Sequence, residues 1–225
     1  MKLSKGCFLL FTISVLLISA CSSTQQAYLQ NVEMYFDNDI DISLSDDEVR
    51  QSPVDLVYVR NGDRPIATMA LAFIEEGRYK WLSKDKAMFI TENGRLVRTH
   101  GLEHNLIYVS NLSADPLKSL SEGNDLSSWT RVIDTEHQDY GVELSSLFSA
   151  TSDEIISIHS HNFKVSKYVE SINYHSAKHS NASWINTYWI HQASGQLLKS
   201  TQKVSALSET VEITYVSRAL RLVEQ

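Results

Sequence analysis

The residue with the clearest covalent chemistry in this sequence is Cys21, which follows an apolar N-terminal segment. Lys2 and Lys5 precede an apolar run over 7–18, and this order of charge and hydrophobicity is typical of a secretory signal peptide. The sequence ISAC then has the form of a lipobox, whose cysteine thiol takes a diacylglyceryl group and becomes the first residue after cleavage. The run is too short for a comfortable transmembrane helix. We therefore predict a signal peptide over 1–20 and lipid on Cys21.

Lipidation at Cys21 also predicts where the protein resides. Ser22 follows the cysteine in place of Asp, and by analogy with enterobacterial sorting this favours the outer membrane over the inner one. We expect a lipid-anchored protein on the periplasmic face of the outer membrane of a Gram-negative bacterium. A plain secretory signal with a chance cysteine, or an uncleaved anchor, is the alternative. With Cys7 cleaved off and Cys21 acylated, no cysteine remains for a disulfide, for thiol catalysis or for a metal.

An acidic run has residue types that bind calcium. Asp37, Asp39, Asp41 and Glu48 match positions 1, 3, 5 and 12 of an EF-hand loop. Ile42 occupies the position that requires glycine, and a β-branched side chain resists the positive φ needed there. A solvated acidic linker is therefore the preferred interpretation.

The histidines and serines form no recognisable catalytic or metal site. The chain has eight histidines, of which His159 and His161 would share one face of a strand. There is no His-Glu-x-x-His pattern and no acidic third ligand at a fixed spacing. Gly-x-Ser-x-Gly and phosphate-binding loops are also absent from the sequence. We predict a protein that is not an enzyme and that has no metal and no cofactor.

Aromatic and basic residues offer a different chemistry, because sugar rings stack on aromatic faces and basic groups pair with uronate or phosphate. Most aromatic rings in a curved sheet belong to the core, so the alternative is that these side chains serve only to pack the core. The candidates for contact with a glycan or a partner protein are Arg78, Lys80, Trp81, Trp184, Tyr188 and Trp189.

The first element expected after the signal segment is a short helix. Residues 21–44 are polar and acidic with little periodicity, which predicts a flexible lipidated tether. Ser45 and Glu48 then form a capping box, and Pro53 ends the helix by about Gln51. The remainder, 45–225, is long enough for one core and is predicted to be a single β domain.

Strands dominate this domain, and the stretch 77–102 is its clearest part. Arg78–Leu82, Lys86–Thr91 and Gly94–His100 alternate, and Asn93-Gly94 between the last two predicts a type I′ hairpin. The other predicted strands are Val54–Arg60, Ile66–Ile74, Trp129–His137, Val142–Ser149, Glu154–His161, Lys164–His175, Trp184–Gln192, Gln196–Val204 and Thr210–Arg218.

Three details accompany these strands. The first strand alternates, with Val54, Leu56, Tyr58 and Arg60 on one face, and Ile66–Ile74 is expected to be buried on both faces. The apolar face switches along Lys164–His175, which predicts a bulge or strong coiling. The segment 102–124 breaks the pattern, with a short helix or irregular strand and then one helical turn after Asp115.

About eleven or twelve antiparallel strands with little helix predict a sheet that must curl or split. We favour one large curved antiparallel sheet, a half-barrel, with the segment 102–124 inside its concavity. A two-sheet β-sandwich is the alternative.

The motifs in this region resemble a known family. The sequence YKWLSKDKAMFITENGRLVRTHGL, together with SDDEVRQSPVDLVYVRNG upstream and TYWIHQASGQLLKSTQKV downstream, resembles the YjbF/GfcB family over about 45–218. These bacterial lipoproteins are linked to export of group 4 capsule and related exopolysaccharides. The resemblance implies a curved sheet like that of lipoprotein carriers, and partner proteins of a polysaccharide export system. It carries no catalytic residue.

Charge narrows the possible partners. The formal net charge is −7, and it becomes more negative once Lys2 and Lys5 leave with the signal segment. Such a chain is not a general nucleic-acid binder, and acyl chains must anchor it to the membrane. We expect an accessory or scaffold lipoprotein of capsule or exopolysaccharide assembly and export, with acidic polysaccharide as a candidate ligand. The alternatives are a carrier of lipid or another apolar ligand inside the half-barrel, and a periplasmic glycan-active enzyme with paired carboxylates.

Overall fold

The computed structural model describes residues 43–120, 128–136, 140–175 and 182–224. All of them belong to the second of the two units, 1–36 and 37–225, into which the chain divides. The predictions for the signal segment, Cys21, residues 21–42 of the tether and the acidic residues 37–41 therefore lie outside the described residues.

The described residues form one antiparallel sheet with 12 strands in the order β5-β4-β3-β2-β1-β12-β11-β10-β9-β8-β7-β6. The strands are β1 Leu56–Asn61, β2 Ala67–Glu75, β3 Arg78–Leu82, β4 Met88–Glu92, β5 Arg95–His100, β6 Leu106–Val109, β7 Ser128–Thr135, β8 Val142–Ile158, β9 His161–His175, β10 Ala182–His191, β11 Leu197–Lys203 and β12 Thr210–Thr214. The helices are α3 Asp46–Gln51, the 3-10 turns η1 Leu112–Ala114 and η2 Pro116–Lys118, and α4 Val216–Val223.

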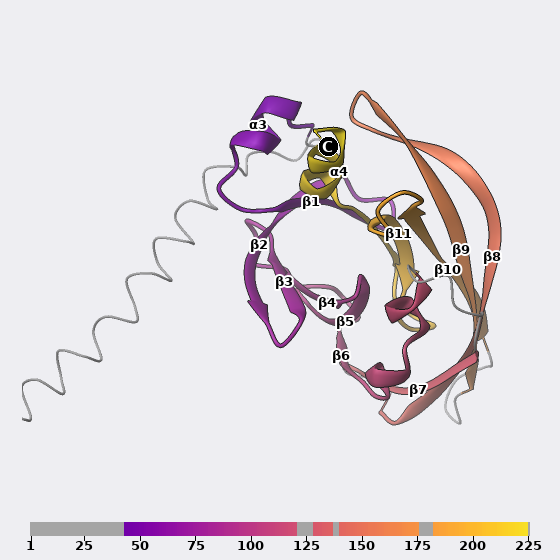
Figure 1. The fold of residues 1–225 in the computed structure, drawn as a ribbon. Helices are drawn as coiled ribbons and strands as arrows, with labels where there is room; N and C mark the ends of the chain where they lie inside the picture. Colours follow the sequence, from indigo (N-terminus) through magenta and orange to yellow (C-terminus); the bar gives the residue numbers. More distant parts are fainter. Residues whose placement is uncertain (1–42, 121–127, 137–139, 176–181, 225) are drawn as a thin grey trace, which may run out of the picture. The chain divides into compact units, whose positions relative to one another are not determined.

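The sheet curves until it is nearly closed as a barrel (Figure 1). β1 pairs with β12, which joins the early strands to the late ones. The two edge strands, β5 and β6, are consecutive in the chain. They lie close together, and the Leu106 N–H of β6 donates to Thr99 Oγ1 of β5 at 2.8 Å. The prediction of one large curved antiparallel sheet is confirmed, and the two-sheet sandwich is excluded by the single strand order.

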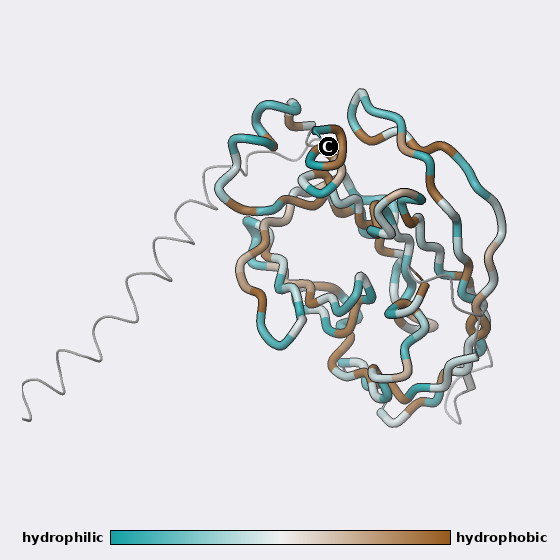
Figure 2. The backbone as a smooth tube through the Cα atoms, viewed as in Figure 1, coloured by the Kyte–Doolittle hydropathy of each residue, from teal (hydrophilic) through white to brown (hydrophobic). Residues whose placement is uncertain are grey.

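Two local motifs form as the sequence predicts. Asn93 and Gly94 have φ angles of 50° and 86°, as a type I′ turn between β4 and β5 requires. Ser45 caps α3, with Glu48 completing the capping box, and the helix ends at Gln51. α3 is mostly hydrophilic, and Val49 is its buried residue (Figure 2).

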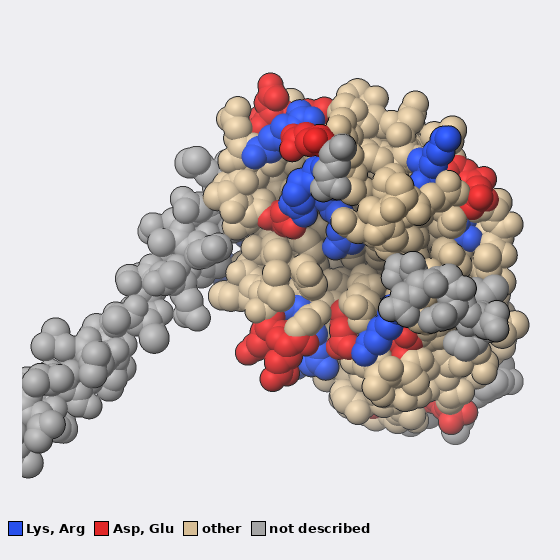
Figure 3. Space-filling view, in the orientation of Figure 1, with Lys and Arg blue, Asp and Glu red and all other residues tan. Residues whose placement is uncertain are grey.

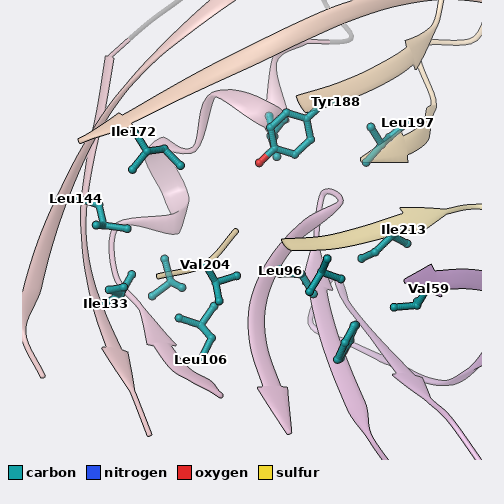
Figure 4. Packing of buried hydrophobic residues seen from close by; sticks show 14 of the residues in the cluster. Val59, Leu96, Leu106, Ile133, Leu144, Ile172, Tyr188, Leu197, Val204 and Ile213 are labelled. Carbon is teal, nitrogen blue, oxygen red and sulfur yellow. The ribbon is translucent and has the colours of Figure 1, made fainter. Parts of the chain in front are cut away.

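The segment after β5 fills the barrel interior. β6 provides Leu106, and η2 with the residue pair after it provides Leu117 and Leu120, all less than 9% exposed and part of the central hydrophobic cluster. Figure 4 shows Leu106 gathered with Ile133 and other apolar groups of that cluster. The predicted packing inside the concavity therefore holds for Leu117 and Leu120, whereas β6 belongs to the sheet itself as an edge strand and leaves Tyr108 exposed.

The end of the chain differs from the prediction. The strand expected over Thr210–Arg218 stops at Thr214, and α4 begins at Val216. Tyr215 continues the apolar alternation of β12, so the pattern concealed the change of element. α4 buries Val216, Ala219 and Leu220, which have the spacing of one helix face. The segment is too short for this spacing to be recognised in the sequence.

The burial of β1 depends on α4, and the burial predicted for β2 needs correction. Val57 and Val59 face the core cluster, whereas Leu56 is buried beside α4, where its N–H donates to Ser217 Oγ at 2.8 Å. β1 is therefore buried on both faces near its start, because α4 covers the side that faces away from the core cluster. β2 is buried only near its start, and Phe73 and Ile74 are 44% and 59% exposed.

The two strands predicted over Val142–Ser149 and Glu154–His161 are one long strand. β8 has 17 residues and pairs with the 15 residues of β9. The bulge predicted for the β9 segment lies in its partner, where the register shifts between Ala150 and Ser152 opposite Tyr168 and Lys167. A strand with a bulge in its middle resembles two shorter strands in sequence.

Candidate functional site

A concavity lies where several turns meet α4, and we call it the mouth pocket. Its volume is about 410 Å³. The residues that line it are Asp55, Tyr79, Thr91, Asn93, Gly94, Leu117, Lys118, Ile190, Gly195, Gln196, Leu197, Tyr215, Arg218 and Arg221. Figure 3 shows this face hollowed, with basic groups on more than one side of the hollow.

α4 supplies two arginines to the mouth pocket from adjacent turns of one helix face. Arg221 forms a bidentate pair with Asp55, with Nη2 2.9 Å from Oδ2, and this hydrogen bond raises the pKa of the arginine. Arg218 instead donates from Nη1 to the Leu197 carbonyl at 2.6 Å. Among the described residues no carboxylate lies within 4.0 Å of Arg218, so its charge has no counter-ion there.

Tyr215, the residue before α4, forms part of the same wall. Its side chain is 2% exposed, its hydroxyl has no hydrogen-bond partner in the described structure, and the Arg218 guanidinium lies 4.3 Å from its ring centroid. Burial raises the pKa of Tyr215, and the charge of Arg218 partly opposes this. The Thr91 side chain also lies near the hydroxyl and lowers its pKa, but the two do not form a hydrogen bond of good geometry, so the hydroxyl is neutral and poorly satisfied.

Gly94 brings backbone close to this tyrosine. A Cβ at residue 94 would lie 2.1 Å from a Leu197 methyl carbon and 3.7 Å from the Tyr215 hydroxyl, and φ there is +86°. Both the space and the backbone conformation thus require glycine. Gln202 fixes the position of this turn, because its Nε2 donates to the Gly94 carbonyl at 2.8 Å and its Oε1 accepts from Leu96 N at 3.0 Å.

The opposite wall combines a lysine and an aromatic ring. Lys118 Nζ lies 3.3 Å from Glu92 Oε1, a carboxylate that it shares with Arg78, so its charge is partly compensated. Tyr79 stacks on Trp81, with ring centroids 6.2 Å apart and an interplanar angle of 16°. Asp55 is the sole carboxylate among the described lining residues. The mouth pocket therefore suits binding of an anion, and its described wall lacks the paired carboxylates that glycoside hydrolysis uses.

A buried charge cluster under the mouth pocket holds its walls in place. Arg95 makes a bidentate pair with Asp115 at 2.5 and 3.0 Å, and its Nη1 also lies 2.9 Å from Glu170 Oε2. Arg131 Nη1 lies 3.0 Å from the other oxygen of Glu170. These four side chains are at most 5% exposed. They carry two positive and two negative charges, so the cluster is neutral.

Aromatic and hydroxyl groups complete this cluster. The guanidinium carbons of Arg95 and Arg131 lie 4.4 and 4.2 Å from the ring centroid of Trp129. The Tyr188 hydroxyl donates to Glu170 Oε2 at 3.1 Å. Burial alone would raise the pKa of Glu170, but the charges of Arg95 and Arg131 outweigh it and lower the pKa to about 2.

The sequence did not predict this cluster. Arg95 and Asp115 are 20 residues apart, and Arg95 and Glu170 are 75 apart, so no local spacing brings them together. The available signal was weak: charged residues at inward-facing strand positions, where apolar side chains are expected. Arg95 follows Gly94, and Asp115 precedes η2, so their pairing fixes two parts of the mouth pocket.

The structure separates the residues that the sequence proposed for glycan or partner contact. Arg78 Nε lies 3.1 Å from Glu92, and Lys80 pairs with Glu75 at the surface. Trp81 is 3% exposed and Tyr188 is completely buried, so neither presents a ring face to a ligand.

The two other tryptophans lie on opposite sides of the sheet. Trp184 packs against the core, and its Nε1 donates to the Lys203 carbonyl at 2.8 Å. Trp189 is half-buried, bonds through Nε1 to Glu154, and lies 5.5 and 5.6 Å from the ammonium groups of Lys167 and Lys199. Its contact with a glycan or a partner stays a prediction.

The histidines of the β8–β9 turn contact α3. His159 Nδ1 and His161 Nε2 lie 2.7 and 2.8 Å from the two carboxylate oxygens of Asp46. The hydrogen bond from His161, with that from His159, lowers the pKa of Asp46 against partial desolvation. Tyr58 stacks on His159 with centroids 5.6 Å apart. The described residues contain no group of three metal-ligating side chains, and none of their helices is long and apolar enough to span a membrane.

Comparison with known proteins assigns the chain to a family. The family described as group 4 capsule polysaccharide lipoprotein GfcB, YjbF matches residues 29–216. The uncharacterized lipoprotein GfcB of Escherichia coli K12 is 30% identical over 213 residues, which is 94% of this chain and 98% of that protein. The lipoprotein YjbF of the same strain is 31% identical over 206 residues, covering 91% and 94%.

A solved structure agrees with this assignment. The hypothetical lipoprotein YmcC of Escherichia coli K12 superposes with a TM-score of 0.71 at 32% identity, covering 82% of this chain and 92% of that one. The family match spans most of the chain, including β1 to β12 and the residues of the mouth pocket up to Tyr215. The chain belongs to the YjbF/GfcB family of lipoproteins.

Proposed function

We propose that this protein is an accessory scaffold of capsule or exopolysaccharide assembly and export, anchored to the outer membrane by lipid on Cys21 and facing the periplasm. The observation that carries the proposal is the match of residues 29–216 to a family that is described as group 4 capsule polysaccharide lipoprotein. The export-system partners and the outer-membrane placement are part of the proposal.

The packing of the barrel interior supports a scaffold over a lipid carrier. A carrier needs an apolar void of several hundred Å³ for acyl chains. Here Leu106, Leu117 and Leu120 occupy the interior as part of the core cluster. The mouth pocket is large enough, but Arg218, Arg221 and Lys118 line it, and a charged wall disfavours acyl chains.

The proposal assigns no reaction to the protein. A glycan-active enzyme of the common type needs an acid and a second carboxylate facing each other across the substrate. Asp55, the single carboxylate in the described wall of the mouth pocket, is held by Arg221 and is therefore poorly suited to proton transfer.

Deletion of the gene in its host tests the proposed function. We expect reduced surface polysaccharide in the deletion strain, restored by the wild-type gene and poorly restored by Cys21→Ala, measured as cell-surface uronate and as capsule thickness by electron microscopy. Affinity capture of the native lipoprotein from detergent-solubilised membranes should recover export components. Unchanged surface polysaccharide after deletion would contradict the proposal.

A further inference from the structure

The mouth pocket contains a cation that the described protein leaves without a counter-ion. Lys118 has Glu92 and Arg221 has Asp55, whereas the guanidinium of Arg218 has a backbone carbonyl and the face of Tyr215. Arg218 is only partly exposed, so solvent compensates its charge less than it would at an open surface. An anionic group in the pocket would supply the missing partner, and a planar guanidinium matches a carboxylate with two parallel hydrogen bonds.

The Tyr215 hydroxyl is a second, independent sign of a ligand. It is buried in the pocket wall beside the Thr91 side chain without a hydrogen bond of good geometry, although buried polar groups are almost always paired. Burial raises its pKa, so the hydroxyl keeps its proton and can donate to an anion. A buried donor left unpaired costs stability, and a ligand oxygen that accepts its proton removes that cost.

The shape of the mouth pocket favours a sugar over a peptide. Its volume of about 410 Å³ accommodates one or two sugar rings. The rim consists of the turns 93–94 and 195–196, η2 and α4, so it offers no open strand edge for an extended peptide. The Tyr79 ring and the side-chain amides of Asn93 and Gln196 provide the stacking face and the hydroxyl partners typical of saccharide sites.

The pocket is also preorganised. The Arg95–Asp115 pair joins the start of β5 to η2, and Gln202 holds the Gly94 carbonyl, so two walls are fixed from below before a ligand arrives. Arg218 is oriented by its hydrogen bond to the Leu197 carbonyl and by the Tyr215 ring. Little side-chain entropy remains to be lost on binding.

We propose that the mouth pocket binds a carboxylate-bearing saccharide unit, with the carboxylate on Arg218 and Tyr215 and the sugar ring against Tyr79. The choice of a saccharide as the carrier of the carboxylate rests on the proposed function, and the choice of an anion rests on the pocket alone. None of the residues that the sequence proposed for glycan contact belongs to the mouth pocket.

Calorimetry with the full-length lipoprotein in detergent tests the inference. Digalacturonate is the probe, neutral digalactose the matched sugar, and inorganic phosphate and an acidic hexapeptide the competing anions. We expect digalacturonate to bind, digalactose to bind at least tenfold more weakly, and phosphate and the peptide not to displace the acidic sugar.

Two variants examine the assigned groups. Arg218→Gln keeps a donor for the Leu197 carbonyl but removes the charge, and should weaken digalacturonate binding at least tenfold. Tyr215→Phe removes only an unpaired hydroxyl, should leave the melting temperature unchanged or raised, and should weaken binding severalfold. Arg64→Gln, an exposed arginine outside the mouth pocket, is the charge-matched control and should bind as wild type.

The outcomes separate this inference from the proposed function. Equal binding of digalactose, or unchanged binding by a folded Arg218→Gln, would overturn the carboxylate site. Tighter binding of the peptide or phosphate would overturn the saccharide class. If deletion reduces surface polysaccharide but the lipoprotein does not bind digalacturonate, the proposed function stands and the carboxylate site fails. If digalacturonate binds the lipoprotein but deletion leaves surface polysaccharide unchanged, the site stands and the proposed function fails.

Discussion

Replacing Glu170 by Gln should destabilise the domain far more than any surface charge change of the same kind. Glu170 is completely buried and faces Arg95 and Arg131 at 2.9 and 3.0 Å. The substitution preserves shape and leaves two buried guanidinium groups with one carboxylate, Asp115. Removing one partner of a buried ion pair typically costs about 3–5 kcal/mol.

The pKa of Glu170 gives an independent estimate of this cost. It falls from 4.5 to about 2 in the folded protein, and at about 1.4 kcal/mol per unit this corresponds to about 3 kcal/mol at neutral pH. Because the folded pKa is depressed, the stabilisation is present above the unfolded value near 4.5 and is lost as the pH falls toward 2. Gln does not titrate, so the difference between the two proteins should shrink over that window.

Urea unfolding monitored by tryptophan fluorescence at pH 7, 5, 4 and 3 measures both effects. Glu212→Gln is the matched control, because Glu212 lies 2.9 Å from Lys199 with side chains 35% and 28% exposed. That exposed pair should contribute less than about 1 kcal/mol. The reasoning is refuted if Glu170→Gln costs no more than Glu212→Gln at pH 7, or if its cost does not decrease between pH 5 and pH 3.

Three further predictions follow from single features. Gly94→Ala should cost about 2 kcal/mol or more in urea unfolding, because the new Cβ meets Leu197 at 2.1 Å and φ is +86°, whereas Gly77→Ala, also at positive φ but with open space, should cost about 1 kcal/mol; equal costs would remove the steric argument. Cys21→Ala should leave an uncleaved precursor without palmitate label, and normal cleavage with soluble release would exclude a lipoprotein. Chelator treatment of the purified protein should leave its melting temperature unchanged, and a loss of several degrees that Ca²⁺ or Zn²⁺ restores would reveal a metal site.

Local signals determined the parts of the fold that the sequence predicted well. The turn at Asn93-Gly94 needs two positive φ angles, and few residue pairs tolerate them, so the dipeptide and the turn imply each other. The cap at Ser45 and Glu48 is equally local, since all its hydrogen bonds lie within four residues. Alternation then identified most strands, because one face of the sheet is buried along much of their length.

The sequence patterns were least informative where a second element changed what a pattern meant. Alternation along β1 cannot choose a face when α4 covers the outer one, so Leu56 is buried as deeply as Val57. Tyr215 extends the pattern of β12 although the chain has already turned toward α4. In both places the deciding contact comes from a helix of only eight residues, which an 11-to-18-residue window does not resolve.

The candidate site was less predictable than the fold for a physical reason. Arg218 lies on α4 and Tyr215 directly before it, but the pocket they line depends on Gly94 and on the turn 195–196. Those segments meet only because the sheet closes, and residues brought together in this way have no characteristic spacing in the sequence. The aromatic residues chosen from sequence were those with regular strand positions, and regular inward positions lead to the core, as Tyr188 does.

The buried charge cluster and the mouth pocket are best understood together. Four buried charges are an expensive way to fill a barrel, and well-packed apolar residues usually serve stability as well or better. The bidentate Arg95–Asp115 pair, however, has a fixed direction that apolar packing lacks, and it ties η2 to the first residue after Gly94. A cluster retained for stability alone has no reason to lie directly behind two walls of the pocket. Loss of Glu170 should therefore loosen η2 and weaken ligand binding under conditions where the domain is still folded, which links the interior of the barrel to its mouth.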